Sequence, residues 1–123
     1  MLPNFYYQNY QEFAAILQQL QANAKRNESD TGGLRQCFQE AQQFFQQRIV
    51  SLDAPELAPS IESRIRAYNT EIDKQLRLLG VDVMFLQAAR QPETASARQE
   101  QVFTRIQMLL GYCDALLAKS DES

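Results

Sequence analysis

The sequence predicts an all-α protein, an antiparallel bundle of about four helices with one long central helix. Good helix formers are plentiful, whereas glycine and proline occur only four times each in 123 residues. Apolar residues recur at spacings of three and four over long stretches, and clusters of turn-forming residues separate these stretches. The length suits a single domain over residues 1–123, with fraying expected at 1–3 and 120–123.

The first helix is expected from about Asn4 to about Lys25. Its apolar side chains advance by steps of four and three, and so form one seam: Tyr6, Tyr10, Phe13, Leu17, Leu20 and Ala24. The polar stretch that follows, up to Gly33, is expected to be a flexible connector because it gathers turn formers and charges.

The second helix is expected from about Leu34 to about Leu52. Phe44 and Phe45 are adjacent in it, so on a regular helix they should not both face one neighbour. One of the two rings is therefore expected to contact a third helix or an interface. Beyond this helix, Asp53 and Glu56 have the spacing of a capping box, which predicts a short helical turn before a new start near Pro59.

The third helix is expected from about Ser60 to about Arg90, a length of about 45 Å. Its seam has two consecutive steps of four, which relax a strict heptad toward an eleven-residue repeat: Ile61, Ile65, Tyr68, Ile72, Leu76, Leu79, Val83 and Leu86. The N-terminal half is polar and is expected to be solvated. Gly80 is expected to let a neighbouring backbone come close, since glycine lowers helix propensity there without another evident benefit.

The segment 76–86 within this helix is apolar on nearly every side. One stripe contains Leu76, Leu79, Val83 and Leu86, and a second contains Leu78, Val81, Phe85 and Ala89. A helix of this kind must be covered on nearly every side, by its own chain or by a second copy. The sequence therefore predicts a homodimer as one way to bury the excess apolar surface.

The fourth helix is expected from about Thr94 to about Lys119, because Pro92 disfavours helical backbone at Gln91. Its seam is Val102, Ile106, Leu109, Cys113 and Leu116.

The composition argues against enzymes and against cofactor and metal sites. Histidine is absent, which removes the commonest general base and the commonest metal ligand. Cys37 and Cys113 are far apart in sequence and are interpreted as small buried hydrophobes, with a redox pair as the alternative. The sequence contains neither a nucleophile elbow nor a phosphate-binding loop. We therefore expect no catalytic, cofactor-binding or metal-binding residues.

Charge and hydropathy bear on partners and location. The net charge of −3, without a dense basic face, argues against nucleic acid as a partner. No apolar run reaches the length of a membrane span, and the N-terminal residues lack the features of a signal peptide. We expect a cytoplasmic protein with no nucleic-acid or membrane partner.

Asp82 is unusual because an unpaired carboxylate would be costly to bury in such an apolar segment. Its candidate partners are Arg77, Arg90, or an arginine of a neighbouring helix or subunit. Two interpretations stay open, a structurally paired aspartate and a charge at the edge of a binding surface. The candidate partner-binding residues are Lys74, Arg77, Asp82, Arg90 and Gln91.

The stretch Asp73–Gln91 resembles the signature segment of the cyanobacterial heterocyst-frequency control protein PatD family. Gln42–Gln47 and Gly111–Leu117 are similar to further segments of that family, in the same order and at fitting spacing. The first 30 residues fit only in their helical character. The resemblance implies a small all-helical cytoplasmic protein without catalytic activity. It also implies association with the cell-division protein FtsZ, an effect on FtsZ filament assembly, and a link to heterocyst frequency where cells differentiate.

Two other functions are compatible with the sequence. A helical adaptor or antagonist of a transcription or sigma factor would need an exposed apolar groove that embraces an amphipathic helix. A small-molecule sensor would need a roomy cavity lined by Phe38, Phe45 and Phe85, and a close-packed core would count against it.

Overall fold

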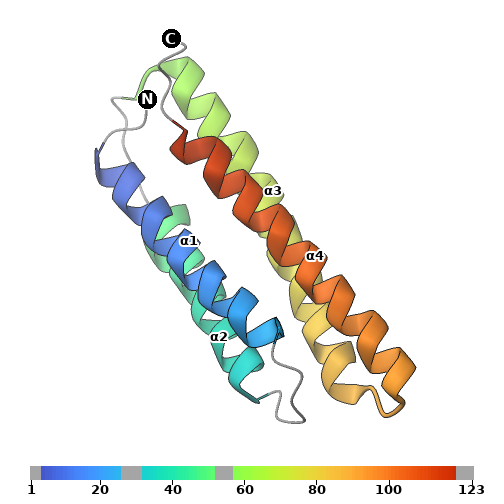
Figure 1. Cartoon of the computed structure of the whole chain (residues 1–123). Helices are drawn as coiled ribbons and strands as arrows, with labels where there is room; N and C mark the ends of the chain where they lie inside the picture. The colour runs from blue at the N-terminus through green and yellow to red at the C-terminus, as the bar shows by residue number, and fades with distance from the viewer. Residues whose placement is uncertain (1–3, 26–31, 52–56, 119–123) are drawn as a thin grey trace.

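Four α-helices alternate in direction along the part of the chain that this computed structural model describes, residues 4–25, 32–51 and 57–118 (Figure 1). They are α1 (Asn4–Lys25), α2 (Gly32–Phe44), α3 (Pro59–Ala88) and α4 (Pro92–Leu117), and the π-helical turn η1 (Phe45–Val50) continues α2. These ranges contain no strand, so the predicted all-α class is confirmed. The predicted fraying at 1–3 and 120–123 and the predicted cap at Asp53 lie outside the described residues.

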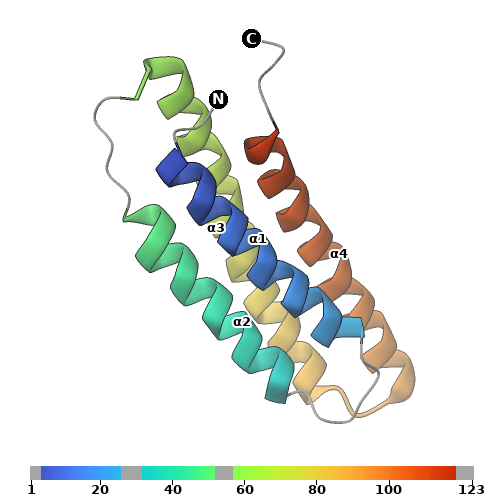
Figure 2. The same cartoon turned by 60° about the vertical axis from the view of Figure 1, so that its left-hand side comes forward.

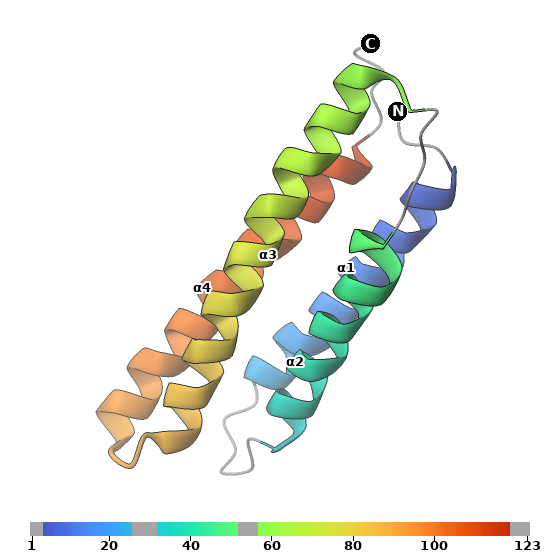
Figure 3. The same ribbon diagram turned by 180° about the vertical axis from the view of Figure 1, so that it is seen from behind.

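The helices form a ring in which α1 lies between α2 and α4, and α3 packs mainly on α4 and to a lesser extent on α2. Figure 2 shows α1 in front of α3, with α2 and α4 on either side. From behind, α3 and α4 form one antiparallel hairpin and α1 and α2 another (Figure 3). Because each helix has only two close neighbours in such a ring, each also keeps a face that points away from the bundle.

Proline sets the start of both long C-terminal helices. Pro59 and Pro92 occupy the first turns of α3 and α4, and the residues before them, Ala58 and Gln91, have extended backbone with ψ of 143° and 141°. This agrees with the steric effect of a proline ring on the residue before it. Both helices therefore begin slightly earlier than the apolar periodicity indicated, at the proline itself.

The predicted seams supply the core. The side chains with essentially no exposure include Tyr10, Phe13, Leu17, Leu20, Phe45, Ile72, Leu79, Val102, Ile106 and Leu109. Across the ring, the buried Tyr10 hydroxyl of α1 donates a hydrogen bond of 2.6 Å to Asn69 Oδ1 of α3. The first turns of α3 project beyond the start of α1 (Figures 1 and 3), and Glu62, Arg64 and Arg66 are exposed there. The predicted solvated half of the long helix is confirmed.

Phe44 and Phe45 both contact one residue of α1, and the prediction that they diverge to different neighbours is wrong. The centroid of the Phe13 ring lies 6.2 Å from that of Phe44 and 5.5 Å from that of Phe45. The expected regular helix changes at Phe45 into the π-helical turn, where rotation per residue is smaller than the about 100° of an α-helix. Phe44 therefore remains at the rim, half-buried, while Phe45 is fully buried on the same side.

Gly80 of α3 lies against the Phe38 side chain of α2. A Cβ atom at Gly80 would lie 2.9 Å from Phe38 Cζ. The predicted close approach therefore occurs, although the neighbour is an aromatic ring and not a backbone. Phe38 itself is buried, so its ring has little room to move aside.

Replacing Gly80 with alanine should lower the free energy of unfolding by about 1 kcal/mol. The alanine gains about 1 kcal/mol of helix propensity, but overpacking against the Phe38 ring costs about 1–3 kcal/mol. Urea denaturation followed by circular dichroism would measure the net effect.

Gly111 provides the matched control for this substitution. It lies in α4, and a Cβ atom there would meet nothing within 4 Å. Gly111→Ala should therefore raise the free energy of unfolding by up to about 1 kcal/mol. Equal stabilisation by both alanines would contradict a steric role for Gly80.

Candidate functional site

An apolar surface lies on the outward face of α3, and we call it the α3 patch. It consists of Leu78, Val81, Met84 and Phe85, which are 37%, 41%, 59% and 47% exposed. Leu78, Val81 and Phe85 are spaced by three and four residues, and Met84 lies three residues after Val81, so the four side chains share one broad side of the helix. Four large apolar side chains exposed to this degree form a patch on the order of 300–400 Å², a size that is often functional in monomeric proteins.

This surface shows that the rest of the chain does not cover residues 76–86 on nearly every side, which is one of the two routes that the sequence predicts. Leu76, Leu79 and Val83 are buried in the bundle, but the stripe that contains Leu78, Val81 and Phe85 faces away from it. The reason is geometric, because α3 has only α4 and α2 as close neighbours and its outer side meets neither. Cover by a second copy, the other route that the sequence predicts, stays a prediction.

Cationic side chains surround the α3 patch. The Arg98 guanidinium of α4 lies 4.6 Å from the centroid of the Phe85 ring. Lys74 and Arg77 are exposed on α3, one turn before Leu78 and Val81 respectively. Arg77 also forms an ion pair of 2.6 Å with Asp73, so the nearest carboxylate on this face is already paired. The surface therefore combines an apolar centre with a positive rim, although the whole chain carries a net charge of −3.

The predicted partner-binding residues lie in three different places in the structure. Lys74 and Arg77 lie beside the α3 patch. Arg90 and Gln91 are exposed in the connection between α3 and α4, about 20 Å further along the helix axis from Arg77. Asp82 is 5% exposed and faces α4, so it does not belong to the outward surface.

Asp82 is held in a buried network between α3 and α4. Arg105 Nε donates to Asp82 Oδ2 at 3.0 Å, and Arg105 Nη1 donates to Gln75 Oε1 at 3.1 Å. Gln75 lies two turns before Asp82 on the same face of α3 and is 4% exposed. Of the two interpretations of Asp82, the structurally paired aspartate is the one that the structure shows, with an arginine from a neighbouring helix.

The sequence did not identify Arg105 as the partner of Asp82. A signal did exist, because the short connection at residues 89–91 makes α3 and α4 antiparallel neighbours. The arginines in α4 are Arg98 and Arg105, so the partner of Asp82 could have been narrowed to these two. In the structure, Arg98 lies over the Phe85 ring, and Arg105 forms the ion pair with the Asp82 carboxylate.

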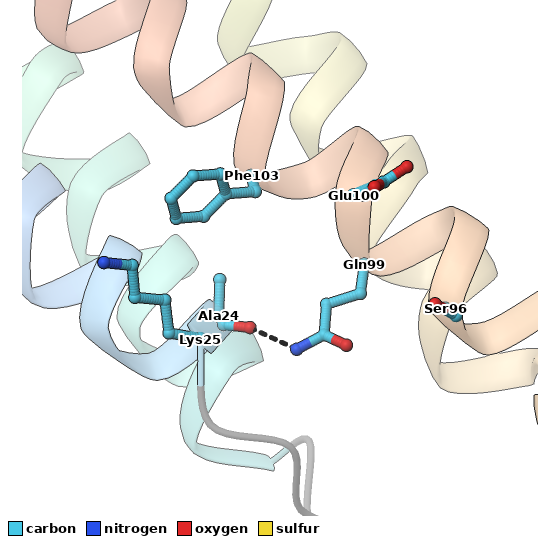
Figure 4. A pocket seen from close by; sticks show the side chains of 6 residues that line it. All are labelled: Ala24, Lys25, Ser96, Gln99, Glu100 and Phe103. Carbon is cyan, nitrogen blue, oxygen red and sulfur yellow. Dashed lines mark hydrogen bonds between the residues drawn. The ribbon is translucent and has the colours of Figure 1, made fainter.

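A shallow hollow of about 280 Å³ lies where the end of α1 meets α4 (Figure 4). Its lining residues are Ala24, Lys25, Ser96, Gln99, Glu100 and Phe103. Gln99 Nε2 donates to the Ala24 carbonyl oxygen at 2.6 Å, which satisfies one of the carbonyls left open at the end of α1. The Lys25 ammonium lies 5.5 Å from the centroid of the Phe103 ring. These polar groups serve to join two helices, and the hollow is open to solvent.

Three of the four groups whose pKa is raised, Tyr10, Cys37 and Cys113, are buried in the core, and the fourth, Tyr112, is partly buried at its edge. Burial raises the pKa of Tyr10, and burial raises the pKa of the Cys113 thiol to about 12. Burial and the neighbouring Glu40 raise the pKa of the Cys37 thiol. Both thiols are buried and unpaired with each other, as expected for small hydrophobes, and they remain protonated at neutral pH. Burial, together with Glu71, also raises the pKa of Tyr112.

The aromatic residues proposed for a sensor cavity do not meet. Phe38 lies against Gly80, and Phe45 lies against Phe13 inside the bundle. Phe85 lies on the outer face beneath Arg98. This separation counts against the small-molecule sensor.

Two features are absent from residues 4–25, 32–51 and 57–118, a metal-binding cluster and a helix that could span a membrane. These ranges contain no group of three or more Cys, Asp or Glu residues placed to hold a metal ion. None of their helices is long and apolar enough to cross a membrane.

Comparison of the chain with profiles of known protein families, with curated proteins and with solved structures finds no match in any of the three.

Proposed function

We propose that this protein is a non-enzymatic, cytoplasmic regulator that binds FtsZ and modulates the assembly of its filaments. In organisms that differentiate cells, the proposal includes an effect on heterocyst frequency. The observation that carries it is the position of the α3 patch. The exposed residues Leu78, Val81, Met84 and Phe85 all lie within Asp73–Gln91, the stretch that resembles the PatD family.

The chemistry of this surface suits a protein partner. Large apolar side chains supply the desolvated centre of a typical interface, and arginine at its edge supplies directional hydrogen bonds. In the described part of the chain, every buried side-chain nitrogen and oxygen has a hydrogen-bond partner, as in the network of Asp82, Arg105 and Gln75. The proposed activity therefore depends on contact and not on bond-making.

The direct test is light scattering of FtsZ assembly with and without this protein, together with the mass of the protein in solution. A change in the rate or extent of assembly supports the proposal, and the mass tests the predicted homodimer. Assembly that is unaffected over the whole range of ratios would remove FtsZ as the partner.

A second candidate, an adaptor or antagonist that holds an amphipathic helix of a transcription or sigma factor, would use the same exposed apolar surface. That function predicts a 1:1 complex with such a factor and no response of FtsZ. The light-scattering experiment therefore separates the two candidates.

Arg77→Ala and Arg90→Ala should each reduce the amount of protein that sediments with FtsZ polymer about two- to fivefold. Charges at the edge of an interface contribute about 0.5–1 kcal/mol and act mainly on the association rate. Arg77 should show the larger effect, because it lies beside the α3 patch while Arg90 lies in the connection.

Arg35→Ala is the matched control, since Arg35 is exposed on α2 and lies outside the proposed surface. It should sediment with FtsZ polymer as the unaltered protein does. Unchanged sedimentation of both Arg77→Ala and Arg90→Ala would remove this face of α3 from the binding site.

A further inference from the structure

We propose that the α3 patch is the docking site for a short amphipathic helix whose apolar stripe is flanked by carboxylates. The inference rests on the proposed function in that FtsZ would carry this segment. It goes further because it names the surface and the chemistry that the surface recognises.

The apolar centre of the patch has the dimensions of a helical ligand. Leu78 and Phe85 are seven residues apart on α3, which is about 11 Å or two helical turns. Val81 and Met84 lie between them on the same face, and Met84 is the most exposed of the four. Methionine adapts its shape easily, which suits a surface that accepts the side chains of another helix. A partner helix of two to three turns would cover these residues.

The cationic residues around the apolar centre favour a ligand that has carboxylates beside its apolar stripe. Lys74, Arg77 and Arg98 border the patch, and Arg90 follows it in the connection to α4. On this side of α3, Asp73 is engaged by Arg77 at 2.6 Å, and Asp82 faces α4 instead, where Arg105 holds it at 3.0 Å.

Glu93 and Glu100 of α4 are exposed carboxylates near these cations in sequence, three residues after Arg90 and two after Arg98. Together with Asp73 they make three carboxylates against the four cations. The rim therefore remains positive on balance. A ligand with glutamate or aspartate beside its apolar stripe would form ion pairs along both edges.

The same charges disfavour a second copy of this chain as the occupant. In an antiparallel pairing centred on Val81, Arg77 of one copy lies opposite Phe85 of the other, where Arg98 already covers the ring. In a parallel pairing, Lys74 lies beside Lys74 and Arg77 beside Arg77. Either arrangement brings cations together at the edge of the contact.

The area of the α3 patch also disfavours a second copy of this chain as the occupant. A stable dimer usually buries about 800 Å² on each partner, roughly twice the area of the α3 patch. A short helix needs no more than the patch provides.

Two synthetic peptides test the recognition chemistry without FtsZ. Both carry leucines at positions i, i+3, i+4 and i+7, one with glutamates beside this stripe and the other with lysines. Fluorescence anisotropy should show that the lysine peptide binds at least about tenfold more weakly, which corresponds to about 1.4 kcal/mol. Equal affinity of the two peptides, or binding of neither, would overturn the inference.

Met84→Glu should abolish binding of the glutamate peptide and reduce sedimentation with FtsZ polymer at least about tenfold. Phe5→Glu is its control, because Phe5 is 55% exposed, close to the 59% of Met84, and lies at the start of α1. Both positions are exposed, so both variants should keep the helical circular dichroism of the unaltered protein.

Different results would disprove the docking site on α3 and the proposed function. If the unaltered protein binds the glutamate peptide but not FtsZ, the docking site stands and the proposed function falls. If FtsZ binding is the same for Met84→Glu and the unaltered protein, the docking site on α3 is wrong and the proposed function stands. If the unaltered protein is a dimer and Met84→Glu is a monomer, a second copy occupies the patch and the inference is overturned.

Discussion

Replacing Arg105 with methionine should lower the free energy of unfolding by about 3 kcal/mol. The side chains of Arg105 and Asp82 are only 18% and 7% exposed, so their ion pair lies largely out of water. Removing one partner leaves a buried carboxylate without its counter-charge, which typically costs about 3–5 kcal/mol. Gln75 loses its donor as well. Guanidinium denaturation would measure the loss.

The double variant Asp82→Leu/Arg105→Met should recover most of this stability. Apolar side chains of similar volume can replace a buried ion pair at little net cost, because the desolvation penalty of both charges disappears. The expected result is therefore a large effect of Arg105→Met alone and a strong, opposing interaction term in the double-mutant cycle. Additive effects of the two substitutions would contradict the interpretation of Asp82 and Arg105 as one unit.

Arg66→Met is the matched control for burial. Arg66 pairs with Glu62 at 2.9 Å, close to the 3.0 Å between Arg105 and Asp82, but its side chains are 72% and 55% exposed. Water and ions screen such a pair, so its loss should cost at most about 0.5 kcal/mol. Comparable losses for Arg66→Met and Arg105→Met would show that burial does not set the strength of the buried pair.

Phe13→Ala should lower the free energy of unfolding by about 3–5 kcal/mol. Phe13 has no exposed surface, and its ring lies against both Phe44 and Phe45. The substitution removes the free energy gained by transferring the ring from water into the core, and it leaves a cavity between α1 and the end of α2. It also removes two aromatic contacts, each worth about 0.5–1.5 kcal/mol beyond the buried area. Thermal unfolding followed by circular dichroism would detect the loss.

Phe5→Ala supplies the comparison on the same helix. Phe5 is 55% exposed and its described aromatic contact is with its neighbour Tyr6, at 6.0 Å between ring centroids. Little buried area is lost there, so the cost should be below about 1 kcal/mol. An equal cost for Phe5→Ala and Phe13→Ala would mean that the cluster around Phe13 does not carry the packing between α1 and α2.

The sequence predicts the helices well because their boundaries depend on local chemistry. Pro59 and Pro92 fix where α3 and α4 begin, and α1 has the predicted bounds of Asn4 and Lys25. The π-helical turn at Phe45–Val50 was not predicted. A change of one residue in the register of a helix depends on how its side chains fit against α1, and apolar spacing alone does not reveal this.

The candidate site could be predicted only in part. Apolar spacing identifies both stripes of the segment 76–86, but it does not tell how many neighbours the helix has. In the ring, α3 is covered on the side of α4 and α2, which leaves Val81 and Met84 outside. The partner of Asp82 likewise depends on which residues of α4 lie opposite α3. Lys74 and Arg77, the predicted partner-binding residues of this helix face, are exposed beside the α3 patch, but the position of Arg98 at the rim follows only from its distance to Phe85.

The contact between α1 and α4 has a consequence for how the chain folds. The pairs α1–α2 and α3–α4 are hairpins of consecutive helices, which form quickly because little chain lies between their partners. Only the pairing of the first helix with the last needs almost the whole length of the polypeptide. During synthesis, the side of α1 that packs on α4 must therefore wait, exposed to water, until the last helix has left the ribosome.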